Sequence, residues 1–566
     1  MKSYKKESIL APLFKLLEAS FELITPLIIA QIIDTGIANG DKGFVLSRCL
    51  ILVGFGVVGM VSAITAQYFA AKAAVGFATE LRHSIFEKIN DLSFSLLDKV
   101  GTSTLLTRIT NDVNQVQNGV NLLLRLFMRS PFIVFGAVIM AATVDVGSLP
   151  LFLTVVVLLS IVVFGIMLLT IKRYKAIQSQ LDSVMNTTRE NLNGARVIRA
   201  FCSEESETEK FISQNSLLSK LQKSTGKISA LLNPVTFILI NTGIVLLIRY
   251  GALKVDSGSL TQGQVVALYN YMSQILVELI KLANLIITVT KAFASAGRIS
   301  DVLDIDTSIV YTDDKSVKNS HAVEFKNVSI HYNEGAKDAL QNISFTADPG
   351  QIIGVIGGTG SGKTTLVNLI SRFYDANEGE ISVGGKDIRS YSDDEIRNKV
   401  HVVLQRAVLF KGTLKDNLMW GNKNASDEDM LSAVKSAQAG DFVSEKGGLD
   451  MEITAEGRNL SGGQRQRLSI ARALVGNPDI LILDDSASAL DYVTEKALRT
   501  ALAELPNKPT LFIVSQRTSS LRHADKILVL DDGALVGCGS HDELLETSEV
   551  YREIYDSQFG GKESAK

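Results

Sequence analysis

The amino-acid sequence predicts an α-helical six-span transmembrane domain followed by an α/β domain with a phosphate-binding loop. Three features of the sequence lead to this fold class. Long apolar stretches fill residues 1–300, a polar stretch follows at residues 301–321, and short strand and helix patterns alternate over residues 322–566. We therefore expect a transmembrane domain, a linker and a largely parallel α/β domain in these three ranges.

The composition agrees with this division. Hydrophobic residues make up 46% of the 566 residues while charged residues still make up 21%, so the charges must be segregated from the apolar stretches. The net charge of −3 gives no reason to expect nucleic acid as a partner. The cysteines Cys49, Cys202 and Cys538 lack the spacing of a metal or redox site, and we interpret them as buried or idle thiols in a reducing compartment.

Six stretches are long enough to cross a lipid bilayer, which takes about 20 helical residues. Three carry no charge (Cys49–Ala71, Leu149–Ile171 and Ile228–Ile248) and three contain charges (Ile9–Ile33, Leu122–Val144 and Val265–Ala292). The connections after the second and fourth spans are long and basic, whereas the opposite connections are short and poor in Lys and Arg. The positive-inside rule then predicts that both termini and the long loops lie in the cytoplasm. Parts of these loops, Phe77–Asn90 and Ser179–Asn191, are expected to be helical.

Three acidic residues inside the predicted spans are candidates for a substrate path: Glu18, Glu22 and Glu278. One interpretation is a polar lining for a cationic or amphipathic substrate. The other is local ion pairing, because Lys15 shares a helix face with Glu18 and Glu22, and Lys281 lies three residues after Glu278. The sequence leaves both interpretations open.

A glycine-rich loop follows the apolar strand expected at Ile352–Ile356. Its sequence, GGTGSGKTT, fits the pattern G-x-x-x-x-G-K-[ST] and precedes an expected helix. Backbone N–H groups of such a loop wrap phosphate oxygens, and the helix N-terminus adds positive potential. We therefore interpret residues 322–566 as a nucleotide-binding domain, with Lys363 reaching the phosphates and Thr364 ligating Mg²⁺. The loop consists of Gly357, Gly358, Thr359, Gly360, Ser361, Gly362, Lys363, Thr364 and Thr365.

Two further elements belong to this expected site. Asp484 ends the apolar strand Ile480–Asp484, so its carboxylate can hold Mg²⁺ through the water shell of the ion. The sequence LSGGQRQR begins at Leu460 and precedes a helix, which makes it a second phosphate-binding turn. One domain does not need two such turns for one γ-phosphate. We infer that each turn serves a different nucleotide across a dimer.

These motifs resemble those of the ATP-binding cassette (ABC) family, and of its exporters in particular, over the whole chain. The resemblance implies that ATP is bound with Mg²⁺, that Tyr332 stacks on adenine, and that Gln405 opens a "Q-loop" at the metal. It also implies an SALD turn at Ser488–Asp491, and a signature that completes the partner's site. The signature residues are Leu460, Ser461, Gly462, Gly463 and Gln464. The loops near Thr102–Asn114 and Cys202–Gln214 resemble the coupling helices of the family.

Two residues depart from the family pattern. Asp485 stands where the family usually has the Glu that polarises the attacking water, and Gln516 stands where it has a switch histidine. The shorter side chain of Asp485 withdraws its carboxylate, and a misplacement near 1 Å can cost about 10²-fold in rate. Gln516 can bond a phosphate oxygen but cannot carry a charge, and His523 is not expected to replace it. We therefore expect ATP to be bound well and hydrolysed slowly, the alternative being two harmless replacements.

The intact signature then predicts a second, different ABC half-transporter subunit, which supplies the missing Glu and His. The leading hypothesis is a heterodimeric exporter that moves amphipathic small molecules out across the cytoplasmic membrane. Alternatives are a dedicated lipid or peptide exporter, and a nucleotide-gated channel or regulator that does not pump. The six apolar spans exclude a soluble cassette ATPase acting on DNA or ribosomes.

Overall fold

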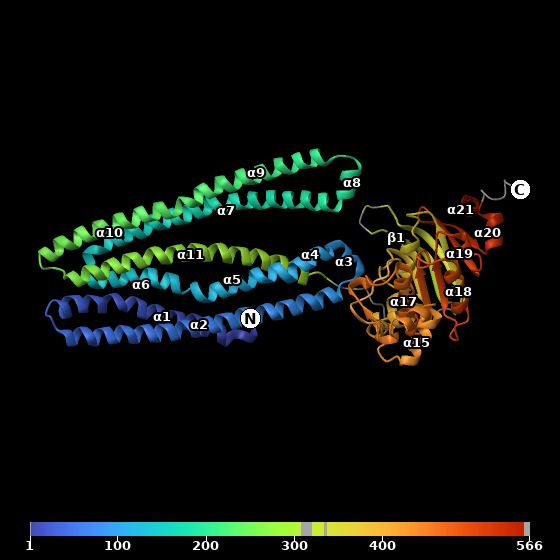
Figure 1. Cartoon of the computed structure of the whole chain (residues 1–566), viewed down its shortest axis with the longest axis horizontal. Helices are drawn as coiled ribbons and strands as arrows, with labels where there is room; N and C mark the ends of the chain where they lie inside the picture. Colours follow the sequence, from blue (N-terminus) through green and yellow to red (C-terminus); the bar gives the residue numbers. More distant parts are fainter. Residues whose placement is uncertain (1, 307–319, 333–334, 336, 560–566) are drawn as a thin grey trace. The chain divides into compact units, whose positions relative to one another are not determined.

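The computed structural model describes residues 2–306, 320–332, 335 and 337–559. The chain divides into two compact units (Figure 1). The helical unit contains Met1–Asp91 and Gly101–Ile305, and the sheet unit contains Leu92–Val100 and Asp306–Lys566. Most of the linker expected at residues 301–321 lies outside the described residues.

The helical unit is built from long helices that lie side by side (Figure 1). Six helical stretches within the described residues are long and apolar enough to span a membrane, which confirms the six predicted spans. Their bounds are α1 Lys5–Gln31 with a π-helical end at Ile32–Ile37, α2 Lys42–Asp91, α4 Thr102–Thr107, a π-helical turn at Arg108–Asp112, α5 Val113–Leu126, α6 Arg129–Val144, α7 Leu149–Asn193, α8 Ala195–Ala200, α9 Glu204–Ala230, α10 Leu232–Asp256 and α11 Gln262–Leu303. The third span is thus interrupted between α5 and α6.

Several of these helices are much longer than a bilayer requires. Helix α2 has 50 residues, and at 1.5 Å per residue it extends for about 75 Å. Helix α7 likewise continues beyond the apolar stretch to Asn193. The expected helical character of Phe77–Asn90 and Ser179–Asn191 is therefore confirmed.

The two loop segments predicted to resemble coupling helices are largely helical, since α4 begins at Thr102 and α9 begins at Glu204. A further short helix precedes each segment: α3, Phe94–Val100, lies before Thr102–Asn114, and α8 lies before Cys202–Gln214. Gly101 has a φ of +80° and ends α3, so the chain after Gly101 belongs to the helices that return into the helical unit.

One buried cation connects three helices of the helical unit. Arg129, at the start of α6, is 7% exposed, and Glu278 of α11 is 2% exposed. The guanidinium of Arg129 lies 2.7 Å from Glu278 Oε1 and 2.7 Å from Glu22 Oε2 on α1. Ser130 Oγ donates to Glu278 Oε2 at 2.8 Å, and Lys281 Nζ lies 2.7 Å from Glu278 Oε1. This geometry favours the ion-pair interpretation of Glu278, because its carboxylate is buried among donors rather than lining an open path.

The sheet unit is organised around a six-stranded sheet in the order β12-β11-β3-β10-β9-β6. Its strands are β3 Ile352–Gly357, β6 Val400–Val403, β9 Ile480–Asp484, β10 Thr510–Val514, β11 Lys526–Asp531 and β12 Ala534–Gly539, and β12 alone among them is antiparallel to its neighbour. A second, antiparallel sheet has the order β2-β1-β4-β5, with β1 Val323–Ile330, β2 Leu340–Ala347, β4 Glu378–Val383 and β5 Lys386–Asp387. A third, two-stranded antiparallel sheet pairs β7 Gly412–Thr413 with β8 Glu452–Ile453.

Both faces of the six-stranded sheet are buried. Alternate residues of β9 enter two different apolar clusters, with Leu481 and Leu483 in one and Ile480 and Ile482 in the other. This is the pattern of a parallel sheet covered on both sides. The described helices that accompany it are α3 Phe94–Val100, α12 Lys363–Ile370, α13 Asp393–Lys399, α14 Leu414–Leu418, α15 Asp427–Ser436, α16 Gly440–Glu445, α17 Gly462–Val475, α18 Tyr492–Ala503, α19 Thr518–Leu521, α20 His541–Thr547 and α21 Glu549–Phe559.

The buried ion cluster makes a testable contribution to stability. Replacing Arg129 by Met leaves Glu278 with Lys281 as its remaining cation, so we expect the free energy of unfolding to fall by up to about 3–5 kcal/mol. Glu22→Gln should cost less, because the Glu22 side chain is 39% exposed. The measurement is the temperature at which the detergent-solubilised protein loses its monodisperse elution peak. Arg129→Met/Glu278→Met should recover part of the loss, and equal temperatures for Arg129→Met and Glu22→Gln would contradict the assignment.

Candidate nucleotide-binding site

The candidate site lies at one edge of the six-stranded sheet. Strands β3, β10, β9 and β6 are parallel neighbours, so their carboxyl ends lie along the same edge. The loop after β3 carries Lys363, the segment after β10 carries Gln516, the end of β9 carries Asp484 and Asp485, and the loop after β6 carries Gln405. The sheet therefore brings together motifs that are far apart in the sequence, at the position where open α/β sheets bind ligands.

The phosphate loop depends on glycine at two positions. A Cβ atom on Gly357 would lie 2.1 Å from Leu530 O and 2.5 Å from Ser361 Oγ, and a Cβ atom on Gly362 would lie 2.6 Å from Ala339 O. Gly362 also has a φ of +96° and directly precedes α12. Side chains at these positions would collide with neighbouring backbone, so the tight turn whose N–H groups can hold phosphate oxygens requires glycine there.

Lys363 lies inside this loop. Its Nζ donates to the backbone oxygens of Gly357, at 2.9 Å, and Gly358, at 2.6 Å. Burial lowers the pKa of Lys363, while the carboxylates of Asp485 and Asp484 act in the opposite direction. A bound anion would further favour the charged ammonium group. The position and electrostatics of Lys363 thus fit a phosphate-binding role.

The carboxylates of β9 form the acidic side of the site. Thr364 Oγ1 donates to Asp484 Oδ1 at 3.3 Å, and Gln405 Nε2 donates to Asp485 Oδ2 at 3.3 Å. Burial raises the pKa of Asp484, and the hydrogen bond from Thr364 opposes this shift. Burial also raises the pKa of Asp485, against the effects of Gln405, Lys363 and Arg517. A cation would relieve the cost of keeping these two acids charged side by side.

This donor set suits magnesium. Thr364 and Asp484 supply hard oxygen atoms, and Gln405 lies within reach of the neighbouring acid. Among the described residues, no group of three or more His, Cys, Asp or Glu side chains could hold a metal ion by itself. Magnesium typically binds through one or two protein oxygens together with water and phosphate oxygens, so this arrangement fits an ion that arrives with a nucleotide.

Tyr332 lies at the rim of the site and is 45% exposed. Its hydroxyl shares a 2.9 Å hydrogen bond with Thr365 Oγ1 of the phosphate-loop helix. Its ring meets the edge of the Tyr374 ring, with 5.1 Å between centroids and an interplanar angle of 88°. The hydroxyl of Tyr374 donates to Asp98 Oδ2 at 2.5 Å, on α3. Tyr332 thus presents an aromatic surface of the kind on which a nucleobase can stack.

The signature residues Ser461 and Gln464 cap the N-terminus of helix α17. Ser461 N-caps α17 by accepting from the Gln464 backbone N–H, and the Gln464 side chain accepts from the Ser461 backbone N–H at 3.1 Å. Ser461 and Gly462 are exposed, whereas Leu460 is buried. A cavity of about 320 Å³ lies between this turn and the Q-loop, lined by Gln405, Gly462 and their neighbours. An exposed helix N-terminus of this kind is suited to bind an anion.

Some residues around the site were not found from the sequence. The positive charge of Arg517 opposes the rise in the pKa of Asp485, yet Arg517 is not part of any motif recognised in the sequence. Tyr374 and Asp98 are 276 residues apart, and Phe94 stacks on Phe373 with 4.3 Å between ring centroids. No local pattern links these pairs.

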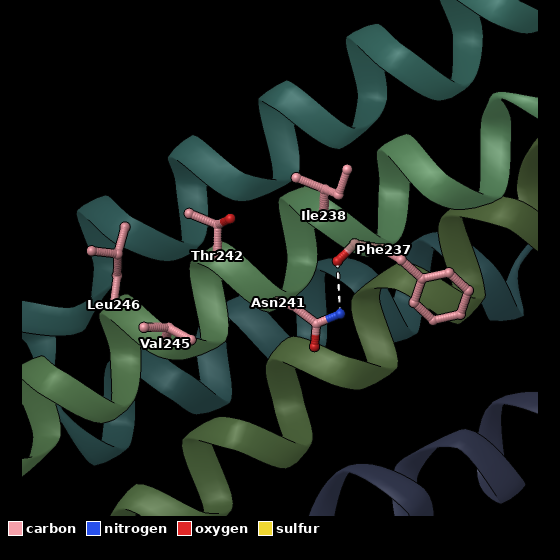
Figure 2. Close-up of a pocket in the computed structure, with 6 residues that line it drawn as sticks. All are labelled: Phe237, Ile238, Asn241, Thr242, Val245 and Leu246. Carbon is pink, nitrogen blue, oxygen red and sulfur yellow. Dashed lines mark hydrogen bonds between the residues drawn. The ribbon is translucent and has the colours of Figure 1, made fainter.

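A separate feature of the helical unit is an exposed face of α10. Figure 2 shows six side chains that line a depression of about 460 Å³ on this helix, among them Phe237, Ile238 and Val245. Two uncharged polar residues, Asn241 and Thr242, interrupt the apolar surface. Asn241 Nδ2 donates to the Phe237 backbone oxygen at 2.8 Å. The face therefore combines apolar area with a small number of hydrogen-bonding groups.

Six membrane-spanning helices joined to this phosphate-loop domain define an ATP-binding membrane transporter. Comparison with known proteins agrees: residues 8–279 match the ABC transporter transmembrane region, and residues 340–488 match the ABC transporter domain. The ABC transporter ATP-binding protein YfiB of Bacillus subtilis is 36% identical over 572 residues, which is 100% of this chain and 99% of YfiB. The chain belongs to the ABC transporter family, and it is a multi-pass membrane protein.

Two further similarities were found. The ATP-dependent lipid A-core flippase of Syntrophus aciditrophicus is 33% identical over 491 residues, covering 85% of this chain and 80% of the flippase. A solved structure of a bacterial Atm1-family ABC exporter with ATP bound has a TM-score of 0.81 at 24% identity, and the match covers 98% of each chain. The predicted fold class is thereby confirmed: the chain has the fold of an ABC exporter.

The role of Lys363 can be tested by substitution. We expect Lys363→Met to weaken binding of Mg²⁺-ATP by about 10- to 100-fold, because a hydrogen bond to a charged group contributes about 1.5–3 kcal/mol. The measurement is a titration of the full-length protein with a fluorescent ATP analogue. Lys496→Met, which changes an exposed lysine of α18, is the matched control. Unchanged affinity in Lys363→Met would contradict the assignment of the phosphate site.

Proposed function

We propose that this chain is one subunit of a heterodimeric ABC exporter and that its own phosphate loop forms a slow ATP site. The observation that carries the proposal is the position of Asp485. Its carboxylate accepts from Gln405 at 3.3 Å and follows Asp484 directly, beside an otherwise complete set of nucleotide-binding residues. The residue expected to polarise water is therefore a short acid, and it is already engaged by the Q-loop.

The geometry of Asp485 explains why hydrolysis should be slow. Asp485 has a φ of +45°, and its backbone N–H donates to Val514 O at 3.1 Å, so its backbone position is fixed. The missing methylene can therefore not be compensated easily by a backbone shift. Gln516, after the neighbouring strand, adds no titratable group. Loss of a general base typically costs about 10²- to 10⁴-fold in rate, whereas the residues proposed to bind ATP and Mg²⁺ are all present.

The partner subunit is expected to supply what this chain lacks. Its phosphate loop, with a Glu and a His at the corresponding positions, would be completed by Ser461–Gln464 of this chain. Exposed apolar side chains support association with a second subunit: Phe201, next to α8, is 77% exposed, and Trp420, which stacks on Phe410, is 67% exposed. Exposed aromatic groups of this kind mark interaction surfaces.

In the proposed cycle, ATP closes two nucleotide-binding domains on each other, and the short loop helices transmit this closure to the spans. The packing of α3 against Phe373 and Tyr374 supports this role, because both residues follow the phosphate-loop helix α12. A magnesium ion held near Thr364 and Asp484 would neutralise phosphate charge. The slow site would retain ATP and hold the two domains together between transport cycles. The chain is expected in the cytoplasmic membrane with both termini in the cytoplasm.

The proposed substrate is an amphipathic small molecule. The exposed face of α10 supports this class, because it offers apolar area together with Asn241 and Thr242. Glu18 and Glu22 remain candidates for contact with a cationic group, although Lys15 Nζ lies 2.5 Å from Glu18 Oε2 and Arg129 binds Glu22. A dedicated lipid exporter is the second candidate, and the similarity to a lipid A-core flippase favours it.

Restoring the two missing groups should accelerate hydrolysis. We expect Asp485→Glu/Gln516→His to raise the ATPase rate of the purified full-length chain by about 10²-fold, because the longer acid can reach the attacking water and the histidine can bear charge. The measurement is steady-state phosphate release at saturating Mg²⁺-ATP. Adding Lys363→Met to the double variant should abolish the gain. A wild-type chain that alone hydrolyses ATP as fast as the double variant would refute the slow-site proposal.

The α10 face can be tested with transport. Asn241→Leu/Thr242→Val should raise the KM for a polar-headed amphipathic dye by about 5- to 50-fold while leaving basal ATPase unchanged, because two hydrogen bonds of about 0.5–1.5 kcal/mol each are lost. The measurement is dye accumulation in inverted vesicles that contain both subunits, with a fluorescent lipid as the alternative substrate. Thr65→Val is the control, since the Thr65 hydroxyl bonds Val61 O within α2. An unchanged KM would exclude this face as a substrate contact.

A further inference from the structure

The carboxyl-terminal helix reaches the segment that carries Gln516. Gln558, in the last turn of α21, donates from Nε2 to the backbone oxygen of Gln516 at 2.8 Å. Its Oε1 accepts from the backbone N–H and from the hydroxyl of Thr518, each at 3.0 Å. One side chain thus holds the backbone on both sides of Arg517. Neither residue 516 nor α21 lies within the regions matched by the family comparison, which end at residue 488.

Helix α21 is anchored firmly enough to impose this position. Tyr551, near its start, is fully buried, and its hydroxyl shares a 2.7 Å hydrogen bond with His541 Nδ1 of α20. The ring of Tyr555 lies 5.7 Å from the His541 ring and 4.8 Å from the Phe559 ring. Tyr551 and Tyr555, one helical turn apart, therefore attach one face of α21 to His541, and Gln558 extends from a helix that is held independently of the nucleotide site.

Residues 515–518, which follow β10, have few other hydrogen bonds that set the orientation of residue 516 within the part of the chain that the structure describes. The segment leaves the sheet at Ser515, whose backbone N–H donates to Val355 O at 3.1 Å and whose hydroxyl accepts from the Arg517 backbone N–H at 3.0 Å. Gln516 itself is exposed. Its backbone carbonyl points to Gln558, and the orientation of this peptide group determines where the side chain of residue 516 can reach. A misplacement of about 1 Å at such a position is enough to reduce turnover strongly.

We propose that Gln558 is a positioning residue that fixes residue 516 beside the phosphate loop, so that the carboxyl-terminal helix controls turnover at this nucleotide site. The inference rests on the proposed function for the role of residue 516. The proposed function concerns which residue stands at position 516, whereas this inference concerns how Gln558 holds that residue in place. Gln558 acts through the backbone and is not expected to contact the nucleotide.

The test places Gln558→Ala in two versions of the full-length chain, Asp485→Glu/Gln516→His and Asp485→Glu/Gln516→Ala. With His at residue 516 we expect kcat for ATP to fall about tenfold and KM to stay unchanged, because a displaced side chain loses its contact in the reacting state. With Ala at residue 516 we expect no effect, because no side chain remains to be positioned. Ser557→Ala is the control, since the Ser557 hydroxyl donates to Ile554 O within α21.

A second substitution distinguishes loss of the hydrogen bond from loss of folded structure. Gln558→Glu keeps the acceptor for Thr518 but loses the donor to Gln516 O, so its kcat should lie between those of the parent and Gln558→Ala. Both variants should unfold at the same temperature as Ser557→Ala. Equal losses of kcat in the His and Ala backgrounds would show a purely structural role and overturn the proposal, as would an unchanged kcat in both.

A readout without hydrolysis separates this inference from the slow-site proposal. In the otherwise unchanged chain, Gln558→Ala should release bound Mg²⁺-ATP about threefold faster than Ser557→Ala, because Gln516 no longer meets the phosphate. If the Asp485→Glu/Gln516→His background shows no turnover, the slow-site proposal fails and the release rate alone decides the role of Gln558. Equal release rates would then overturn it.

Discussion

The parallel pairing of β3, β10, β9 and β6 is the constraint on which the rest of the site depends. Because these strands run in the same direction, their loops meet at one edge and place Lys363, Gln516, Asp484 and Gln405 together. Burial of both sheet faces keeps the strands in register. The chemistry of the site is then decided by short side chains at fixed backbone positions, and this is why one methylene at residue 485 can matter.

Much of the fold could be predicted because it depends on local sequence. A span needs about 20 apolar residues, and the phosphate loop needs glycines at set positions because a Cβ at Gly357 or Gly362 would collide with the backbone. The same locality made the signature recognisable, since Ser461 and Gln464 form a capping box within four residues.

The remaining features could not be predicted because they depend on contacts between distant residues. The partner of Glu278 is Arg129, which is 149 residues away, and the sequence could not decide between ion pairing and a substrate contact. Helix α3 was not predicted, because the stacking of Phe94 on Phe373 leaves no local pattern in the sequence. The sequence around Gln558 does not distinguish it from any other helical glutamine, and its hydrogen bond to residue 516 depends on the folded structure.

The assignment of Leu92–Val100 to the sheet unit has a consequence for how the protein can be divided. Residues 306–566 do not include every segment that packs in the sheet unit. Helix α3, from earlier in the chain, stacks on Phe373 and accepts a hydrogen bond from the Tyr374 hydroxyl. A soluble fragment that begins after the spans would expose this aromatic pair to water. Its tendency to self-associate, and the environment of the neighbouring Tyr332, would then differ from those in the intact membrane protein.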